Sequence, residues 1–551
     1  MSQLLTRFSH VQAHEFNASI RSQRVESKVS PPPGNPVSGK WIAGLNDQQA
    51  AAIGSPLQGA VLILAGAGSG KTTVLTRRVA HLMECFPNTG ILALTFTKDA
   101  AHEMETRLRA LLGPDEAVAS LPMIGTFHAF AFGLLRSGYH GIPNWSRLGF
   151  SRCPALLDPA ARTAWLAAEK KSSGLEVPLE MLEGWIADAF SDAPGVDARL
   201  SKVPSVAASP SGNLPSEISA SNPSPSVHRE SLRTRFRSHL MESGSLAFDD
   251  MVALAIRLFR SHPEVLADTR ARYPQVLVDE FQDTSRDQLE LVKLLCGDAA
   301  NLFLVGDDDQ AIYGFRGADP RNIGEALAHF PAMRIVKLEI NYRSSRAIVA
   351  YANGVFRDKP APLRKTLEAG RPLGVAPVRR IVHEVGAEQG QWMVGEMQRL
   401  RREEGLAWGD MAVLFRLNVL EAYYRSMLAR LAGDQAAKEV VLSTVHAAKG
   451  LEYPAVFFAG LEDGILPYRR GGEELPPERA EEERRIFYVG VTRAQRFLYL
   501  CSCRKRILRG KTVEAEASPF LRPPSVFPAL SKKAGRALGT LRAWRGRKGS
   551  A

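Results

Sequence analysis

The stretch Leu62-Ile-Leu-Ala-Gly-Ala-Gly-Ser-Gly-Lys-Thr72 decides the fold of the first half of the chain. A short apolar run is followed by a glycine-rich turn and then by a segment with helical periodicity. This order of strand, glycine loop and helix is that of a P-loop, in which backbone N–H groups and the positive end of the helix hold phosphate. Ala65 stands where the general pattern has its first glycine. Because Gly-Lys-Thr follows an apolar strand, a glycine turn without nucleotide is the weaker interpretation.

The residues of this loop are predicted to bind ATP together with Mg²⁺. Lys71 would reach the β- and γ-phosphates, and the hydroxyl of Thr72 would bind the metal. The predicted phosphate-binding residues are Gly66, Ala67, Gly68, Ser69, Gly70, Lys71, Thr72 and Thr73.

A P-loop needs an acidic partner, and the apolar run Val276–Val278 ends in Asp279-Glu280. Two carboxylates would therefore emerge at the carboxyl edge of a parallel sheet, where ligands bind. Asp279 would hold Mg²⁺, directly or through water. Glu280 would accept a proton from the attacking water as a general base. A surface acidic pair is the alternative for an isolated Asp-Glu, but the pair is specific when a P-loop precedes it.

Short apolar runs alternate with helical patterns in two parts of the chain, which predicts an α/β protein with parallel sheets. The predicted strands are residues 60–64, 91–95, 276–278 and 302–305 in the first part, and 378–382, 411–415, 440–444 and 455–458 in the second. A nucleotide cleft between two such domains is the natural expectation.

Composition and charge mark a Ser- and Pro-rich segment and a basic C-terminal tail. Residues 201–226 hold nine Ser and five Pro and predict a flexible loop. The chain of 551 residues has a net charge of +12, which suits a polyanionic partner. Seven basic residues and no acidic one lie between Ser531 and Ala551. This tail is a candidate phosphate-binding arm, with a solvated end as the equal alternative.

The predicted domain boundaries are as follows. A disordered leader covers residues 1–40, and the first α/β domain covers 41–128 and 244–333. A helical insertion covers 129–243, the second α/β domain covers 334–525, and the basic tail covers 526–551.

The five scattered cysteines and the lack of a long apolar run or signal layout predict a reduced cytoplasmic compartment and no membrane segment. Cys501 and Cys503 are too isolated from other ligands to predict a metal site.

Further stretches follow in the order of a known family, and the chain resembles the UvrD/Rep-like superfamily-1A DNA helicases. The matching stretches are Leu45–Gln49, Thr95–Thr97, Ala100–Met104, Gly125–His128, Phe248–Asp250, Val278–Thr284, Val305–Ala318, Asn341–Ser344, Thr444–Glu452 and Glu481–Arg493. They run from about Leu45 to Leu500, and their common order excludes an accident. The resemblance implies an α/β fold of two RecA-like P-loop domains with a helical insertion in the first.

The resemblance also implies roles at the ATP site. Gln49 would read adenine, Tyr342 would pack on it, and Glu452 would lie near the ribose. Gln310 would sense the γ-phosphate. Two candidate arginine fingers, Arg343 and Arg493, would stabilise charge on the leaving phosphoryl group. The predicted catalytic set is Lys71, Asp279, Glu280, Gln310, Arg343 and Arg493.

The same resemblance implies contacts with single-stranded DNA by stacking and by positive charge. The predicted DNA-binding residues are Phe96, Thr126, His128, Tyr313, Phe315, Arg316, Thr444 and His446.

Three departures from the family pattern are visible. Ile340 replaces a usual Gln, and Lys98-Asp99 replaces a usual Asn-Lys pair. Members normally carry a helical subdomain, called 2B, before the stretch that begins at Thr444. Between Asn418 and Val440 this chain has room for one helix, at about 420–432, and a short turn.

The favoured function is an ATP-dependent 3′→5′ DNA helicase or translocase acting in DNA repair, replication or recombination. The alternatives are a translocase that remodels protein–DNA complexes with little unwinding and a non-catalytic DNA-binding scaffold. Residue chemistry alone leaves RNA open as a substrate. The expected partners are single-stranded DNA, duplex junctions and an accessory protein, and the expected state is a monomer in the cytoplasm, associated with the nucleoid.

Overall fold

The computed structural model describes residues 37–87, 89–116, 122–174, 177–187, 189–190, 225–297, 301–359, 363–371, 374, 376–469, 473–508 and 510–521. The predicted leader up to residue 36, the predicted loop up to residue 224 and the whole predicted tail lie outside these residues.

The chain divides into two compact units. The first comprises Met1–His81, Glu280–Asp283 and Phe303–Ala551, and the second comprises Leu82–Asp279 and Thr284–Leu302. This division does not follow the predicted domain boundaries, which stay a prediction.

The first unit begins with the strand that leads into the P-loop. β1 (Gly59–Ala65) is an unbroken apolar run that is buried from Ala60 onward, as expected for a strand covered on both faces. It pairs in parallel with β10 (Arg334–Leu338), with Val61 opposite Arg334. The strand that opens the predicted second domain thus joins the strand of the P-loop.

Four helices and two short strands accompany this pair. They are α2 (Gly39–Ile42), α3 (Asp47–Ile53), α15 (Asn322–His329), α16 (Arg346–Val355), β11 (Ile340–Asn341) and β12 (Glu368–Ala369). Two elements run from one unit into the other, namely α4 (Lys71–Cys85) and β9 (Asn301–Gly306).

A five-stranded parallel sheet forms the rest of the first unit. Its strand order is β13-β17-β16-β14-β15, and β18 pairs antiparallel with the far end of β17. The elements are β13 (Arg379–Val385), α17 (Gly386–Glu404), β14 (Met411–Phe415), α18 (Leu420–Ala432), α19 (Asp434–Glu439), β15 (Val441–Thr444), β16 (Tyr453–Phe458), α20 (Pro477–Val491), β17 (Ala494–Leu508) and β18 (Lys511–Glu514).

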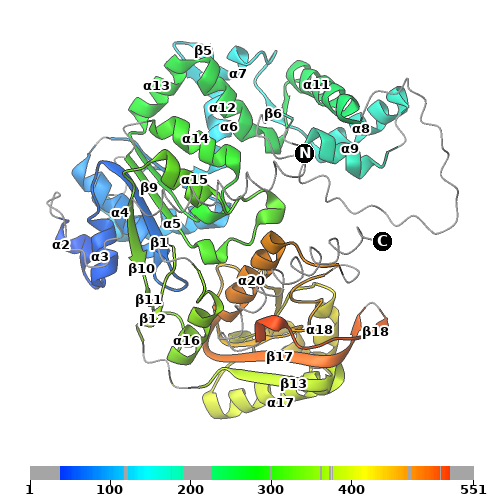
Figure 1. Cartoon of the computed structure of the whole chain (residues 1–551). Coiled ribbons are helices and arrows are strands. Elements are labelled where there is room, and N and C mark those ends of the chain that lie inside the picture. Colours follow the sequence, from blue (N-terminus) through cyan, green and yellow to red (C-terminus); the bar gives the residue numbers. More distant parts are fainter. Residues whose placement is uncertain are drawn as a thin grey trace, which may run out of the picture. The chain divides into compact units, whose positions relative to one another are not determined.

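Alternate residues of the central strands bury opposite faces of this sheet, as the period of two in a strand requires. Leu414 and Phe458 pack in the cluster that includes the apolar side of α20. Val413 and Phe457 pack in the other cluster, with α17 and α18. Figure 1 shows α17 along one side of the sheet and α20 on the other.

Two helices occupy the described span from Asn418 to Val440. The first is α18, at the bounds predicted from sequence, and the predicted turn is the six-residue helix α19. Tyr424, Leu428 and Ala436 are buried in the core of the five-stranded sheet. Both helices are therefore part of this α/β layer.

The second unit contains its own parallel strands and most of the remaining helices. β2 (Ile91–Thr95) pairs in parallel with both β3 (Met123–Thr126) and β8 (Gln275–Val278). The other elements are α5 (Lys98–Glu116), α6 (Phe127–Arg136), β4 (Gly138–Tyr139), β5 (Ile142–Pro143), α7 (Asn144–Arg147), β6 (Ala155–Leu156), α8 (Pro159–Ser173), α9 (Leu179–Ile186), α11 (Pro225–Ser243), β7 (Ser245–Leu246), α12 (Met251–Ser261), α13 (Pro263–Arg272) and α14 (Arg286–Cys296).

The predicted fold class, α/β with parallel sheets, is confirmed. Among the described residues, none of the helices combines the length and apolarity that crossing a bilayer requires.

Candidate functional site: the phosphate loop and its partners

The P-loop residues form a tight turn between β1 and α4, which begins at Lys71. Gly68 and Gly70 have φ of 65° and 85°, in the left-handed region that favours glycine. Each is also closely approached. A Cβ on Gly68 would lie 2.6 Å from Cβ of Arg343, and one on Gly70 would lie 2.7 Å from Nε2 of Gln49. Conformation therefore requires glycine at both positions, and at Gly68 the available space requires it as well.

Lys71 and Glu280, which are far apart in sequence, meet at the loop. Nζ of Lys71 lies 3.4 Å from Oε2 of Glu280, and the side chain of Gln282 donates to the same carboxylate. Burial would raise the pKa of Glu280, but Lys71 and Lys449 outweigh it and lower the pKa to about 2. Glu280 is therefore ionised at neutral pH.

The backbone of Glu280 is strained. Its φ is 47°, and it is one of only two non-glycine residues with positive φ among those described. Such conformations cost roughly 1–3 kcal/mol and cluster at functional sites. Glu280 directly follows Asp279, so the strain lies between the two predicted acidic groups.

Gln310 and Arg493 form a buried hydrogen bond. The guanidinium NH2 of Arg493 donates to Oε1 of Gln310 at 3.0 Å. The other donors of Arg493 bind the backbone oxygens of Val489 and Leu451, both at 3.1 Å. Burial, reinforced by Arg343, lowers the pKa of Arg493 to about 9, so it stays charged at neutral pH.

Arg343 pairs with Glu452, the residue predicted to lie near the ribose. Nε of Arg343 donates to Oε2 of Glu452 at 2.5 Å, and NH1 donates to the backbone oxygen of Thr492 at 3.1 Å. Burial would raise the pKa of Glu452, but Arg343 lowers it. Thr492 adjoins Arg493, so both predicted arginine fingers are anchored at the end of α20.

Gln49 is buried, and its side-chain amide forms hydrogen bonds with other residues of the chain. Its Nε2 donates to the backbone oxygen of Ser69 at 2.9 Å, and its Oε1 accepts from the backbone N–H of Asn46 at 3.2 Å. Asn46 in turn donates to the hydroxyl of Tyr342 at 2.7 Å. The structure thus brings the predicted adenine residues Gln49 and Tyr342 together beside the P-loop, while a direct contact of Gln49 with adenine stays a prediction.

The predicted metal ligands lie in different units. Thr72 is in the first turn of α4, and Asp279 is buried directly after β8, with its backbone N–H bonded to the oxygen of Leu94 at 2.8 Å. A hydroxyl and a carboxylate are oxygen donors of the kind that Mg²⁺ prefers, so the donor set fits this ion.

A second group of acidic residues is held by lysines. Carboxylate oxygens of Asp307, Asp308 and Asp309 lie within 4.8 Å of one another. Lys359 and Lys365 form ion pairs with them. The two lysines thus offset most of the charge of the three carboxylates.

Four predicted DNA-binding residues form one aromatic and basic cluster in the first unit. Phe315 is 65% exposed, and its ring lies 6.0 Å from that of Tyr313 and 5.3 Å from that of His446. The guanidinium of Arg316 lies over both Tyr313 and Phe315. Burial lowers the pKa of His446 to about 4, so its ring is neutral at pH 7. Thr444 ends β15 nearby in sequence.

The remaining predicted DNA residues lie in the second unit. The hydroxyl of Thr126 caps α6 by accepting from the backbone N–H of Ala129 at 3.1 Å. The ring of His128 stacks on Phe248 at 4.1 Å. Burial lowers the pKa of His128. Phe96 lies between β2 and α5.

Sequence reasoning missed Lys449. This residue contacts Gln310 of the nucleotide site and also Tyr313 of the predicted DNA-binding cluster. Its Nζ lies 2.5 Å from Oδ2 of Asp283 and 2.8 Å from the backbone oxygen of Gln310, and it lies over the ring of Tyr313. Burial, with a smaller contribution from Glu280, raises the pKa of Asp283 to about 6 despite Lys449. Lys449 lies in the quoted stretch Thr444–Glu452, so its place in that motif was the available signal.

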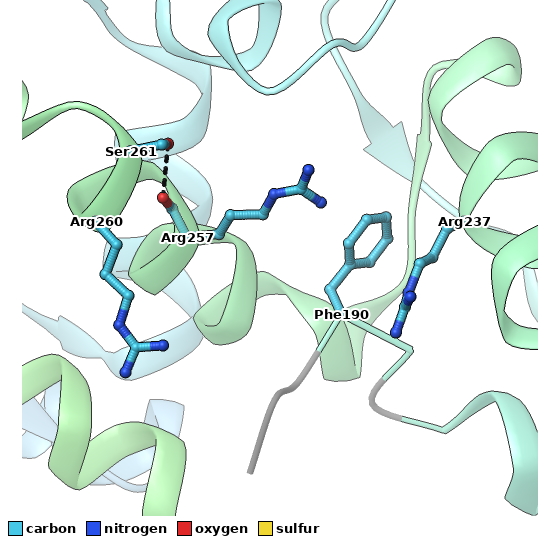
Figure 2. A pocket seen from close by; sticks show the side chains of 5 residues that line it. All are labelled: Phe190, Arg237, Arg257, Arg260 and Ser261. Atoms are coloured by element: carbon cyan, nitrogen blue, oxygen red, sulfur yellow. Dashed lines mark hydrogen bonds between the residues drawn. The ribbon is translucent and has the colours of Figure 1, made fainter. Parts of the chain in front are cut away.

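A cavity of about 400 Å³ lies elsewhere, in the second unit. Arg237, Arg257, Arg260, Ser261 and Phe190 line it, and Figure 2 shows Arg257 pointing toward Phe190. No predicted site residue lines this cavity.

The fold and these contacts define a P-loop protein built on parallel sheets, with two arginines and an acidic residue gathered at the loop. Comparison with known families agrees with this class. Residues 45–331 match the model described as UvrD/REP helicase N-terminal domain, and residues 425–505 match the UvrD-like helicase C-terminal domain. The chain belongs to the UvrD/REP helicase family.

Curated relatives give the same assignment. A protein named probable DNA helicase from Mycoplasma pneumoniae is 32% identical over 468 residues, covering 83% of each chain. The ATP-dependent DNA helicase PcrA of Leuconostoc citreum is 34% identical over 384 residues, covering 68% of this chain and 47% of that protein. The PcrA of Bacillus subtilis is 27% identical over 681 residues, covering 91% of this chain and 88% of that protein.

These alignments bear on the size of the chain. The alignment with the Bacillus protein is longer than the 551 residues of this chain, so that relative contains segments that this chain lacks. The Mycoplasma protein is covered to the same share as this chain, so the two have similar lengths. Within the aligned region, this chain is therefore a more compact form of the family than the Bacillus relative.

Proposed function

We propose that this UvrD/REP-family helicase hydrolyses ATP to move 3′→5′ along single-stranded DNA and to separate duplex strands ahead of it. The observation that carries the proposal is the gathering of Lys71, Glu280, Gln310, Arg343 and Arg493 in one unit around the P-loop. Direction of travel rests on the family resemblance.

The contact between Lys71 and Glu280 supports a division of labour during hydrolysis. When ATP binds, Lys71 would turn to the β- and γ-phosphates, which relieves Glu280 of its nearest cation. The carboxylate would then be a stronger base toward a water that attacks the γ-phosphorus, with ADP as leaving group. Mg²⁺, held through Thr72 and Asp279, would neutralise phosphate charge when bound.

The arginines support the second half of the chemistry. Arg493 is held by two backbone oxygens beside Gln310, so its charge needs little rearrangement to meet a γ-phosphoryl group at that position. Arg343 is held by Glu452 and would be released toward phosphate as that pair opens. Arginines of this kind contribute about 10³–10⁵ in rate.

Lys449 supports coupling between ATP and DNA. It contacts Asp283 and Gln310 on the nucleotide side and the ring of Tyr313 on the DNA side. A shift of Gln310 on hydrolysis would therefore move Lys449 and change its contact with Tyr313. The position of the exposed Phe315 ring, which contacts Tyr313, would change in turn. Stacking of bases on such rings is tolerant of sequence.

Duplex unwinding and translocation without unwinding are separable. A specific observation favours the second as an alternative, since the span from Asn418 to Val440 holds only α18 and α19, both packed into the sheet. We propose that the protein moves readily on bare strands and that long duplexes need an accessory protein.

The experiment that tests this function uses the full chain. ATP turnover is measured without nucleic acid, with a single-stranded DNA and with an RNA of the same sequence. Strand separation is compared on duplexes with a 3′ or a 5′ tail. Stimulation by DNA and preference for the 3′ tail are expected. ATP turnover indifferent to nucleic acid would overturn the proposal, and a 5′ preference would overturn its direction.

The same proposal assigns the protein to DNA repair, replication or recombination on chromosomal DNA. It would act as a monomer, since one chain carries both arginines and the P-loop.

A further inference from the structure

A buried lysine outside all the matched motifs connects to the nucleotide site. The side chain of Lys365 is 1% exposed, and its Nζ lies 3.0 Å from Oδ1 of Asp307 and 2.9 Å from Oδ2 of Asp309. It also pairs with Asp308. Burial opposes the charge of Lys365, but the three carboxylates outweigh it and raise its pKa well above the ordinary value. Lys365 is thus a permanent cation in this cluster.

A continuous chain of contacts runs from Lys365 to the candidate arginine finger. Oδ2 of Asp307 accepts from Nε2 of Gln310 at 2.5 Å. Oε1 of Gln310 accepts from Arg493 at 3.0 Å. Lys365 binds the other carboxylate oxygen of Asp307, so one carboxylate links the lysine to the Gln310 amide.

Asp307 is also connected, through its backbone, to the predicted general base. The backbone N–H of Asp307 donates to Oε1 of Gln282 at 2.8 Å, and Nε2 of Gln282 donates to Glu280. Asp307 is therefore hydrogen-bonded directly to Gln310 and, through Gln282, to Glu280.

We infer that Lys365 is a positioning residue for ATP hydrolysis, which fixes the orientation of the Gln310 amide through Asp307. The inference rests on the proposed ATPase function. An ionised carboxylate only accepts hydrogen bonds, so it requires the NH₂ end of Gln310 and leaves Oε1 facing Arg493. Without Lys365, the Asp307 carboxylate loses the cation at its Oδ1 and can shift. Its hydrogen bond to Nε2 would then no longer hold the Gln310 amide in place beside Arg493.

The position of Lys365 gives this contact a further consequence. By the predicted boundaries, Asp307 lies in the first α/β domain and Lys365 in the second. Their ion pair would then report the approach of the second domain to the γ-phosphate sensor. Lys359, which pairs with Asp309 at 2.5 Å, would reinforce it from the same side.

The test compares three variants with the full-length wild type. Lys365→Met removes the cation, Lys365→Arg keeps it, and Arg506→Met is the matched control. Arg506 is equally buried, at 3%, and pairs with Glu462 in the same unit, but it contacts no residue of the nucleotide site. DNA-stimulated kcat, KM for ATP, binding of a non-hydrolysable ATP analogue and Tm are measured.

The expected result is a split between kcat and binding. Lys365→Met should lower kcat about 100-fold, the loss typical of one displaced transition-state group, while analogue binding changes by less than about threefold. Lys365→Arg should recover most of kcat. Arg506→Met should lower Tm but leave kcat of the folded protein near wild type.

Asp307→Asn keeps the inference testable if Lys365→Met does not fold, because it removes one charge without changing shape. It should also lower kcat and spare analogue binding. Wild-type kcat in Asp307→Asn, or in a folded Lys365→Met, would overturn the positioning role. A wild type that hydrolyses no ATP with DNA would instead overturn the proposed function, and this inference with it.

Discussion

Arg493 donates a hydrogen bond of 3.0 Å to the side-chain oxygen of Gln310, and the arginine is 1% exposed. The two residues are 183 positions apart in the chain. The predicted sensor of the γ-phosphate and a predicted arginine finger are thus in direct contact.

Lys71→Ala is expected to abolish ATP turnover and leave DNA affinity within a few-fold of wild type. Lys71 contacts Glu280 at the P-loop, whereas the DNA cluster is formed by Tyr313, Phe315, Arg316 and His446. Turnover is measured with and without single-stranded DNA, and affinity is measured by fluorescence anisotropy. Turnover equal to wild type would refute the P-loop assignment.

Glu280→Gln should bind ATP and hydrolyse it at least about 100-fold more slowly, because a general base contributes about 10²–10⁴. The amide preserves shape and removes the charge that Lys71 and Lys449 stabilise. Single-turnover hydrolysis and analogue binding separate the two effects. Loss of analogue binding would mean that Glu280 has a structural role.

Arg343→Ala and Arg493→Ala should differ in stability but not in chemistry. Both should lower kcat by about 10³ or more. Arg493 is fully buried and binds Val489, Leu451 and Gln310, so its loss should also lower Tm by several degrees. Arg343→Ala should change Tm little. Equal Tm losses, or unchanged kcat in either variant, would contradict the assignment.

Phe315→Ala should weaken binding of single-stranded DNA by about 1–3 kcal/mol, the usual contribution of one stacked base. Its ring is 65% exposed beside Tyr313 and His446. Ile507→Ala is the control, since Ile507 is 68% exposed on β17 in the same unit. DNA affinity is measured for both. An equal effect of the two variants would exclude a stacking role.

Asp283 should make stability depend on pH in a defined direction. Its pKa is raised from 3.8 to about 6, first by burial, so the folded state binds more protons than the unfolded state between these values. The stability due to the protonated form is present below pH 4 and is lost as pH rises through about 6. Asp283→Asn should remove this loss.

Tm is therefore compared from pH 4 to pH 7 for wild type, Asp283→Asn and Asp463→Asn. Asp463 forms a half-exposed ion pair with Arg469 and serves as control. The difference in Tm between Asp283→Asn and wild type should grow in favour of the variant as pH rises. The difference between Asp463→Asn and wild type should not grow in this way. A constant difference for Asp283→Asn would contradict the raised pKa.

The sequence alone determined the features that depend on neighbouring residues. The P-loop was readable because an apolar strand, glycines and a helix start follow one another within Leu62–Thr72. The strands β1, β2, β8, β9, β14 and β16 were readable for the same reason, since buried parallel strands are short uninterrupted apolar runs. The strands β3 and β10 were not among those predicted. The helix Leu420–Ala432 was predicted at about these bounds, whereas the short turn predicted after it is the helix α19. The family was readable from the order of its motifs.

The tertiary structure alone decided which distant groups meet. No local pattern shows that Lys365 compensates Asp307, that Lys449 contacts both Gln310 and Tyr313, or that β10 pairs with β1. A buried charge must find its partner wherever the chain brings one, because leaving it uncompensated is costly. That requirement acts through space, so a single sequence specifies the partner only by folding.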